Sequence, residues 1–363
     1  MHRIQLDTDC EGPLALNDNA FELCRDFLPD GARFFTQLRN YGEYLVNLAP
    51  KPEYQAGDTV KLILPFLKAA GLTNDRIADY SRQHLSLVPK AEETYRFLHT
   101  LNFPIFAVSA SCRPFAEAVT ARLGFNPERL YCTEASLDSY ELSDTEAREL
   151  HRLLGRIVAA PAIELPPEAK CREDLAPEVQ ETIALMDTIF WETIPGMNIG
   201  RIYRDVKSMG GAAKAQALED SLAKTGLAMS NLMFVGDSIA DVPALRKVRA
   251  EGGVALSFNG NRHAIEAAEI IVVADTAWPV ALLVAVFLQW GKEGVVELAQ
   301  STRPGASKYL AIPEAMIEPI MMGLQGGKTF NLYHPSTSKR PEVIADSTAM
   351  RRRLRGDAIA ALG

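Results

Sequence analysis

The chain has 363 residues, enough for two domains or one large domain with insertions, and its 47% apolar fraction allows a sizeable core. Its formal net charge of −8 argues against a general nucleic-acid-binding protein, which needs a basic face. Five cysteines without a C-x-x-C pair argue against a zinc site or a disulfide framework. An N-terminus that enters a strand pattern at once predicts no signal peptide, so we expect a cytoplasmic protein.

Short apolar runs that end in polar or glycine-containing turns recur along the chain, as in strands buried on both faces of a parallel sheet. They predict strands at 4–6, 105–108, 232–235, 253–256 and 270–273. Helical patterns lie between them, at 114–123, 212–222 and 262–268. The apolar stretch 278–290 is shorter than the roughly 20 residues that cross a bilayer, so we expect a buried helix and no membrane partner. This alternation predicts an α/β fold with a Rossmann-like parallel sheet flanked by helices.

Two regions exceed a minimal α/β unit. Residues 14–88 have a mainly helical pattern, and residues 131–200 are charged and punctuated by prolines. We interpret the first as a helical cap insertion and the second as a further insertion. The core then comprises residues 1–13, 89–130 and 201–299. Residues 300–363 are expected to form an irregular C-terminal extension ending in a helix at 341–362.

Acidic residues follow two of the predicted strands. Asp7 and Asp9 come after the first strand, and Asp237 and Asp241 come after the run Leu232–Val235. Ligands of doubly wound sheets bind at the carboxyl ends of the strands, so we expect one shared carboxylate site. Such a site suits Mg²⁺ and a phosphate group. Alternate residues of a strand share a face, which would direct both Asp7 and Asp9 to this site.

The order Asp7-Thr8-Asp9, Ser109, Lys214 and Asp237-x-x-x-Asp241 resembles the four motifs of haloacid-dehalogenase-like (HAD) hydrolases, nearest to the phosphoserine-phosphatase-like branch. The resemblance covers roughly residues 1–13, 100–130 and 205–290. It implies an aspartyl-phosphate intermediate on Asp7, with Asp9 as general acid and base. Asp7, Asp9 (through its backbone carbonyl) and Asp237 would hold Mg²⁺. Asp241 would bind the metal through water or orient Lys214, although it could equally be a first-turn charge of a helix.

Two phosphate-binding roles stay open. Ser109 ends its strand and can bind a phosphoryl oxygen or cap a helix, and Ser111 is the alternative. Lys214 is expected to neutralise the phosphate, with Lys207 as the alternative.

Some residues depart from the family pattern. Cys10, Glu11 and Gly12-Pro13 do so, and Glu11 either contacts substrate or is an exposed charge. The basic run 351–355 is expected to be a solvated helix face or a tail.

The favoured function is a Mg²⁺-dependent phosphatase acting on a small phosphorylated metabolite. A phosphotransferase or phosphomutase would use the same phosphoenzyme. A non-catalytic binding or regulatory protein is a third hypothesis, because a fold does not fix a function. The sequence leaves the oligomeric state open, a homo-oligomer included.

Overall fold

A computed structural model describes residues 2–166, 168–301 and 312–360. Its centre is a seven-stranded sheet in the order β3-β2-β1-β4-β5-β6-β7. Strands β1 to β6 are parallel, and β7 is antiparallel to β6. The strands are β1 Gln5–Thr8, β2 Ile105–Cys112, β3 Leu130–Thr133, β4 Leu232–Gly236, β5 Val254–Phe258, β6 Ile270–Ala274 and β7 Phe330–Tyr333.

Helices lie between successive parallel strands along the chain, as crossover connections require, and this confirms the predicted Rossmann-like class. All five predicted strands are present, together with β3 and β7, which the sequence analysis missed. The helices of this part are α5 Ala91–Thr100, α6 Arg113–Arg122, α10 Ala212–Thr225, α11 Val242–Ala250, α12 Arg262–Ala267 and α13 Trp278–Gln300. The three helices predicted between strands correspond to α6, α10 and α12.

Helix α13 is, within the described ranges, the one helix long and apolar enough to cross a bilayer. Its residues from Trp278 to Leu288 are all buried, in the same hydrophobic cluster as Leu6 and Val235 of the sheet. Packing against the sheet therefore accounts for its apolar composition, as expected of a buried helix. A break at Gly291, where φ is 68°, separates this buried part from the rest of the helix.

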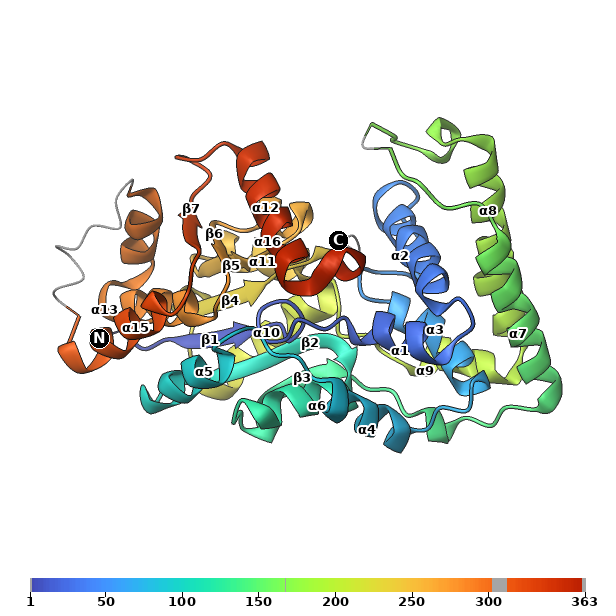
Figure 1. Ribbon diagram of the computed structural model, residues 1–363, viewed down its shortest axis with the longest axis horizontal. Helices are drawn as coiled ribbons and strands as arrows, with labels where there is room; N and C mark the ends of the chain where they lie inside the picture. The colour runs from blue at the N-terminus through green and yellow to red at the C-terminus, as the bar shows by residue number, and fades with distance from the viewer. Residues whose placement is uncertain (1, 167, 302–311, 361–363) are drawn as a thin grey trace.

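The two insertions form a single helical cap around one hydrophobic cluster. Both contribute to that cluster, for example with Phe34 and Phe66 from the first and Leu153 and Phe190 from the second. The helices of the two insertions are α1 Asn19–Phe27, α2 Gly31–Asn47, α3 Thr59–Ala69, α4 Asn74–His84, α7 Asp144–Ala159 and α8 Pro177–Asp187. The short helix α9 Ile202–Asp205 lies in the range expected for the core, but its Ile202 belongs to the same cap cluster. The carboxyl ends of β1 and β2 point toward this cap (Figure 1).

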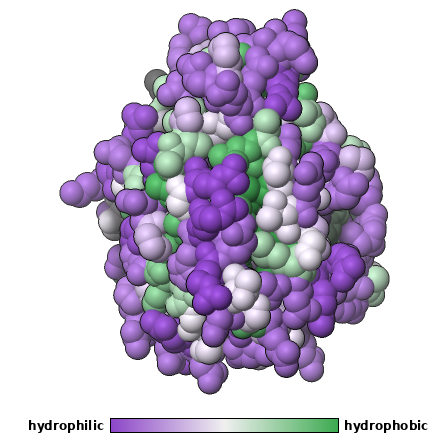
Figure 2. Space-filling model, turned by 90° about the vertical axis from the view of Figure 1, so that its right-hand side faces the viewer, coloured by the Kyte–Doolittle hydropathy of each residue, from purple (hydrophilic) through white to green (hydrophobic). Residues whose placement is uncertain are grey.

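The outer face of the cap is mostly hydrophilic, with hydrophobic residues gathered in a central strip (Figure 2). Partly buried apolar side chains, such as Val158 and Leu185, pack against the cap cluster from outside. The apolar interior of the cap therefore lies close to its surface.

The C-terminal extension is more regular than expected. It contains α15 Glu314–Gln325, the edge strand β7 and α16 Arg340–Ala360. The expected helix at 341–362 corresponds to α16, and its last residues lie outside the described range. Val343 and Met350 of α16 pack against Ile271 and Val273 of β6. This packing places α16 between the sheet and the cap (Figure 1).

Helix α15 packs on α13 through a glycine, and this contact gives a test of the packing. A Cβ atom at Gly323 would lie 2.1 Å from the ring of Trp278. We expect Gly323→Ala to lower the free energy of unfolding by about 1–3 kcal/mol, because the ring must shift in a packed core. Gly155→Ala in α7 is the control, since nothing lies within 4 Å of its added Cβ. It should raise stability by about 0.5–1 kcal/mol. Equal effects in urea denaturation would contradict this packing.

Candidate active site

The carboxyl ends of β1 and β4 bring three aspartates together. The two strands are parallel neighbours in which Thr8 pairs with Val235, and the Asp9 amide donates to the Val235 carbonyl at 2.9 Å. Asp9 and Asp237 therefore leave the sheet side by side. One carboxylate oxygen from each of Asp9, Asp237 and Asp241 lies within 4.8 Å of the others, and all three residues are buried. The predicted shared carboxylate site is thus present, with Asp9 rather than Asp7 as its β1 member.

Lys214 lies at the centre of this cluster. Its ammonium is 2.6 Å from Asp9 Oδ2 and 2.7 Å from Asp241 Oδ1, and the side chain is fully buried. Burial lowers the pKa of Lys214, but the two carboxylates raise it by more, so the net shift is upward and the lysine is charged. Lys207, the alternative candidate, is exposed.

The glycine pair before Lys214 allows close packing with the cap. A Cβ atom at Gly210 would lie 2.3 Å from the carbonyl oxygen of Ala56, and Gly211 has a φ of 54°. Larger residues here would push the cap loop away from the start of α10. The glycines therefore place the Lys214 end of α10 directly beneath the cap.

Asp241 is held by the turn that follows β4. Its Oδ2 accepts hydrogen bonds from the backbone amides of Asp237 and Ser238, both at 3.0 Å, while Oδ1 accepts from Lys214. Both oxygens are therefore engaged. This geometry suits a residue that orients Lys214, and that role stays a prediction.

The structure contradicts the expected position of Asp7. Asp7 lies inside β1, where it accepts hydrogen bonds from Gln5 Nε2 at 2.8 Å and from Ser221 Oγ at 2.6 Å. It shares a strand face with Asp9, as the two-residue period predicts, and both face α10. However, Asp7 contacts α10 seven residues, about two turns, beyond Lys214. It does not line the pocket described below, so we correct its assignment as nucleophile and metal ligand.

Glu11 lies two residues after Asp9, the same spacing that separates Asp7 from Asp9. It lines the pocket, and its Oε1 accepts a hydrogen bond from the Asn19 amide at 2.7 Å. Burial, with the nearby Asp18, raises the pKa of Glu11 to about 8. A carboxyl group with this pKa can hold a proton at neutral pH. The D-x-E spacing is present in the sequence, where Glu11 was expected to be either a substrate contact or an exposed charge.

Ser111 reaches the pocket, whereas Ser109 does not. Ser109 is fully buried, and its Oγ accepts from the Ser111 amide at 3.2 Å. Ser111 lines the pocket, and among the described residues its buried Oγ has no hydrogen-bond partner. An unpaired buried hydroxyl is costly unless a ligand completes it, so of the two serines Ser111 is the better candidate for binding a ligand in the pocket.

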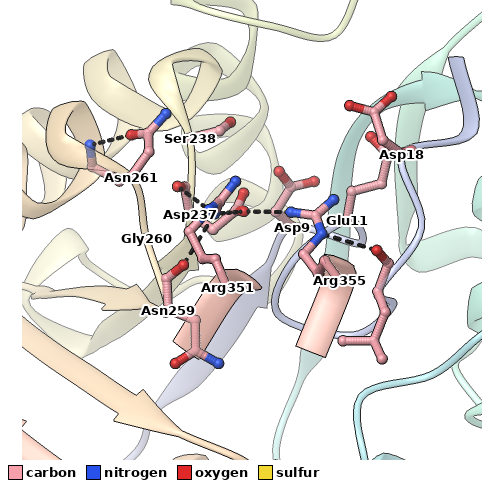
Figure 3. A network of polar contacts seen from close by, with 12 residues as sticks. Asp9, Glu11, Asp18, Asp237, Ser238, Asn259, Gly260, Asn261, Arg351 and Arg355 are labelled. Carbon is pink, nitrogen blue, oxygen red and sulfur yellow. Dashed lines mark hydrogen bonds and ion pairs between the residues drawn. The ribbon is translucent and has the colours of Figure 1, made fainter. Parts of the chain in front are cut away.

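The C-terminal basic run also differs from expectation. Arg351 and Arg355, one turn apart on α16, direct their Nη1 atoms at Asp237 Oδ2, at 2.6 and 3.1 Å (Figure 3). Their side chains are only 5% and 7% exposed. Arg352 and Arg353 face outward and are exposed, as expected of a solvated helix face. The prediction was therefore wrong for the two arginines that carry the contact.

The donor set fits a hard divalent cation, because Mg²⁺ prefers carboxylate oxygens and water. Asp9 and Asp237 are the ligands that the geometry offers, with Asp241 adjacent. Asp237 Oδ2 already accepts from two guanidinium groups. A cation at this site would have to share Asp237 with the arginines or displace them.

One pocket extends from the carboxylates into the cap. Asp9, Glu11, Ser111 and Asp237 line its inner end. Its cap wall is largely apolar and comprises Leu23, Phe35, Val46, Val60, Ile63, Leu64, Leu67 and Ile77. The pocket therefore joins a charged reaction end to an apolar chamber.

The buried Asp7 gives a prediction that separates it from the site. Burial raises its pKa from 3.8 to about 7, although Ser221 and Gln5 lower it. The native state then holds a proton that the unfolded chain loses, so this residue's contribution to stability falls as the pH rises from about 4 to 7. Asp7→Asn removes that dependence. Relative to wild type it should become more stable between pH 4 and pH 8, by up to about 4 kcal/mol.

Urea denaturation at several pH values measures this difference. Asp79→Asn, at an exposed position of α4, controls for the loss of one carboxylate. If the free energy of unfolding depends on pH in the same way in both variants, Asp7 is not protonated in the native state and the prediction is wrong.

No family model matches the chain. The cadmium, zinc and cobalt-transporting ATPase of Bacillus subtilis (strain 168) is 38% identical over 79 residues, which are 22% of this chain and 10% of that protein. The chain thus spans only a small part of this curated relative.

Solved structures extend the comparison to the whole fold. Gene product AF1437 from Archaeoglobus fulgidus has a TM-score of 0.78 and 28% identity, over 98% of each chain. A phospho-aspartyl intermediate analogue of phosphoserine phosphatase has a TM-score of 0.45 and 14% identity, over 75% of this chain and 93% of that one. A HAD family hydrolase from Salmonella enterica has a TM-score of 0.40 and 13% identity, over 71% and 62%.

The first likeness includes the cap and the C-terminal extension, since it covers nearly the whole chain. The motif residues Asp9, Lys214, Asp237 and Asp241 converge at the carboxyl edge of a parallel sheet. The parallel sheet and the positions of these residues agree with the resemblance to HAD-like hydrolases that the motif order implies.

Proposed function

We propose that the protein is a phosphomonoester hydrolase in which Asp9 is the nucleophile and Glu11 is the general acid and base. The observation that carries this proposal is the placement of Asp9 at the inner end of the pocket, beside Lys214 and two residues before Glu11. Phosphoryl transfer needs a positioned nucleophile, an acid for the leaving oxygen and cations to offset phosphate charge. The described residues supply each of these.

The chain's own residues account for the steps. Asp9 Oδ1 accepts from the Cys10 amide at 2.7 Å and Oδ2 pairs with Lys214, so the carboxylate is fixed in orientation. Burial raises the pKa of Asp9, and Lys214 opposes this by favouring the anion that attacks phosphorus. The P–O bond to the alcohol breaks as the Asp9–phosphorus bond forms. Glu11 gives its proton to the leaving alcohol oxygen.

The second half-reaction reverses the role of Glu11. The deprotonated Glu11 takes a proton from water, which attacks and releases phosphate from Asp9. The free hydroxyl of Ser111 contacts a phosphoryl oxygen, whereas Lys214, which is buried behind the pocket, acts through its ion pair with Asp9. A bound divalent cation, held by Asp9 and Asp237, would offset phosphate charge. A phosphotransferase would differ only in passing the phosphoryl group to an alcohol, which product analysis with an added acceptor detects.

Two substitutions test the nucleophile directly. Asp9→Asn should lower kcat for hydrolysis of an aryl phosphate by roughly 10⁴-fold and should abolish labelling of the protein by a phosphorylated substrate. Asp7→Asn is the matched control, because the same chemical change two residues earlier lies outside the pocket. It should keep kcat within a few-fold of wild type. Loss of activity in Asp7→Asn with activity retained in Asp9→Asn would restore the original assignment.

A third variant tests the acid. Glu11→Gln should lower kcat by about 10²–10⁴-fold. It should also lose the pH dependence that a carboxyl with a pKa of about 8 imposes on the wild type. An unchanged pH–rate profile would argue against this role for Glu11.

The apolar chamber predicts a preference among substrates. The cap wall of the pocket is mainly aliphatic, so we propose that the alcohol part of the substrate carries an apolar group. Along a series of straight-chain alkyl phosphates, kcat/KM should rise by roughly two- to fourfold per methylene until the chamber is filled. Ile63→Ala should flatten this rise. Ile183→Ala, a cap-core position away from the pocket, is the control. A flat series in wild type, with higher kcat/KM for sugar phosphates, would contradict an apolar substrate.

A further inference from the structure

The contact between α16 and Asp237 is unlike a surface ion pair. Arg351 and Arg355 place both Nη1 atoms on one oxygen of Asp237, and all three side chains are at most 7% exposed. Surface ion pairs are screened by water and contribute little, whereas a buried charge needs a partner at bonding distance. The two arginines are therefore integral to the electrostatics of the site.

Counting the charges shows what the arginines balance. The cluster holds three carboxylates, Asp9, Asp237 and Asp241. Lys214 contacts the first and the last of these. The charge of Asp237 is met by the two guanidinium groups, which together carry the same charge as one divalent cation. A metal ion bound to Asp237 with both arginines in place would add two positive charges to a set that is already balanced.

The Asp237 carboxylate has little room to move, so it cannot easily bind the two arginines and a metal ion at once. Gly12 packs against it so closely that a Cβ atom there would lie 2.3 Å from Asp237 Cγ. On the other side, Arg351 Nη1 also donates to the carbonyl of Asn259 at 3.0 Å. The Asp237 carboxylate is thus confined between the loop after β1 and helix α16 (Figure 3).

We propose that Arg351 and Arg355 form an internal counter-cation that competes with a divalent metal ion for Asp237, so that metal binding displaces this part of α16. Arg355 also donates to the carbonyls of Leu16 and Asn17, at 2.9 and 2.6 Å. These residues belong to the segment that leads from β1 into the cap. Displacing Arg355 would therefore release this segment together with Asp237. The proposal rests on Asp237 being a cation ligand and does not depend on hydrolase activity.

Metal binding tests the competition. In the double variant Arg351→Met and Arg355→Met, isothermal titration with Mn²⁺ should give a Kd at least about tenfold lower than in wild type, a change of about 1.4 kcal/mol. The control is Arg352→Met, an exposed position on the same helix, which should leave the Kd unchanged. Unchanged or weaker binding in the double variant would overturn the proposal. So would Mn²⁺ binding that survives Asp237→Asn.

Hydrogen–deuterium exchange on the wild-type protein tests the displacement and does not require the arginine variant to fold. Adding Mg²⁺ should speed amide exchange in peptides covering 340–360 and 12–18. Peptides of α7, in the cap away from Asp237, serve as the internal control. Slower or unchanged exchange of α16 in saturating Mg²⁺ would overturn the displacement. Because exchange and titration do not measure turnover, an inactive enzyme would leave both results interpretable.

Discussion

Three carboxylates share one buried volume at the end of β1 and β4, and keeping them charged there is the constraint that the site must satisfy. Like charges this close raise one another's pKa and would take up protons unless cations lie within bonding distance. These cations are Lys214 from α10 and two arginines from α16. The three cations come from two distant parts of the chain, α10 and α16, so both helices must pack against these strand ends to complete the site.

The sequence predicted the parallel core well because strands buried on both faces have a strong local signal. Apolar runs such as Leu232–Val235 carry it within a few residues. The order of the motif residues also placed Lys214 and Asp237 correctly near one site. The two-residue period directed both Asp7 and Asp9 to one face of β1, but it could not show that only Asp9 reaches the pocket, because it fixes a face and not a depth. β1 ends at Thr8, so Asp7 belongs to the strand and Asp9 lies just beyond it.

Long-range features escaped prediction because nothing local marks them. The two insertions read separately as helical and as proline-rich, yet they share one hydrophobic cluster. Likewise, the run 351–355 looks like any solvated basic face. Only its contact with Asp237, more than a hundred residues earlier in the chain, distinguishes Arg351 and Arg355 from Arg352 and Arg353. The burial of a charge depends on its tertiary partner, which local periodicity does not specify.

The central place of β1 in the sheet has a consequence for how the molecule acquires its site. Leu6 pairs on one side with Ile105 and on the other with Met233. The backbone hydrogen bonds of β1 therefore depend on two segments that are distant in the sequence. Contacts of such sequence separation must overcome loop-closure entropy before they contribute stability, and they slow folding. The contact of Arg351 with Asp237 spans 114 residues and adds another long-range contact to the same site.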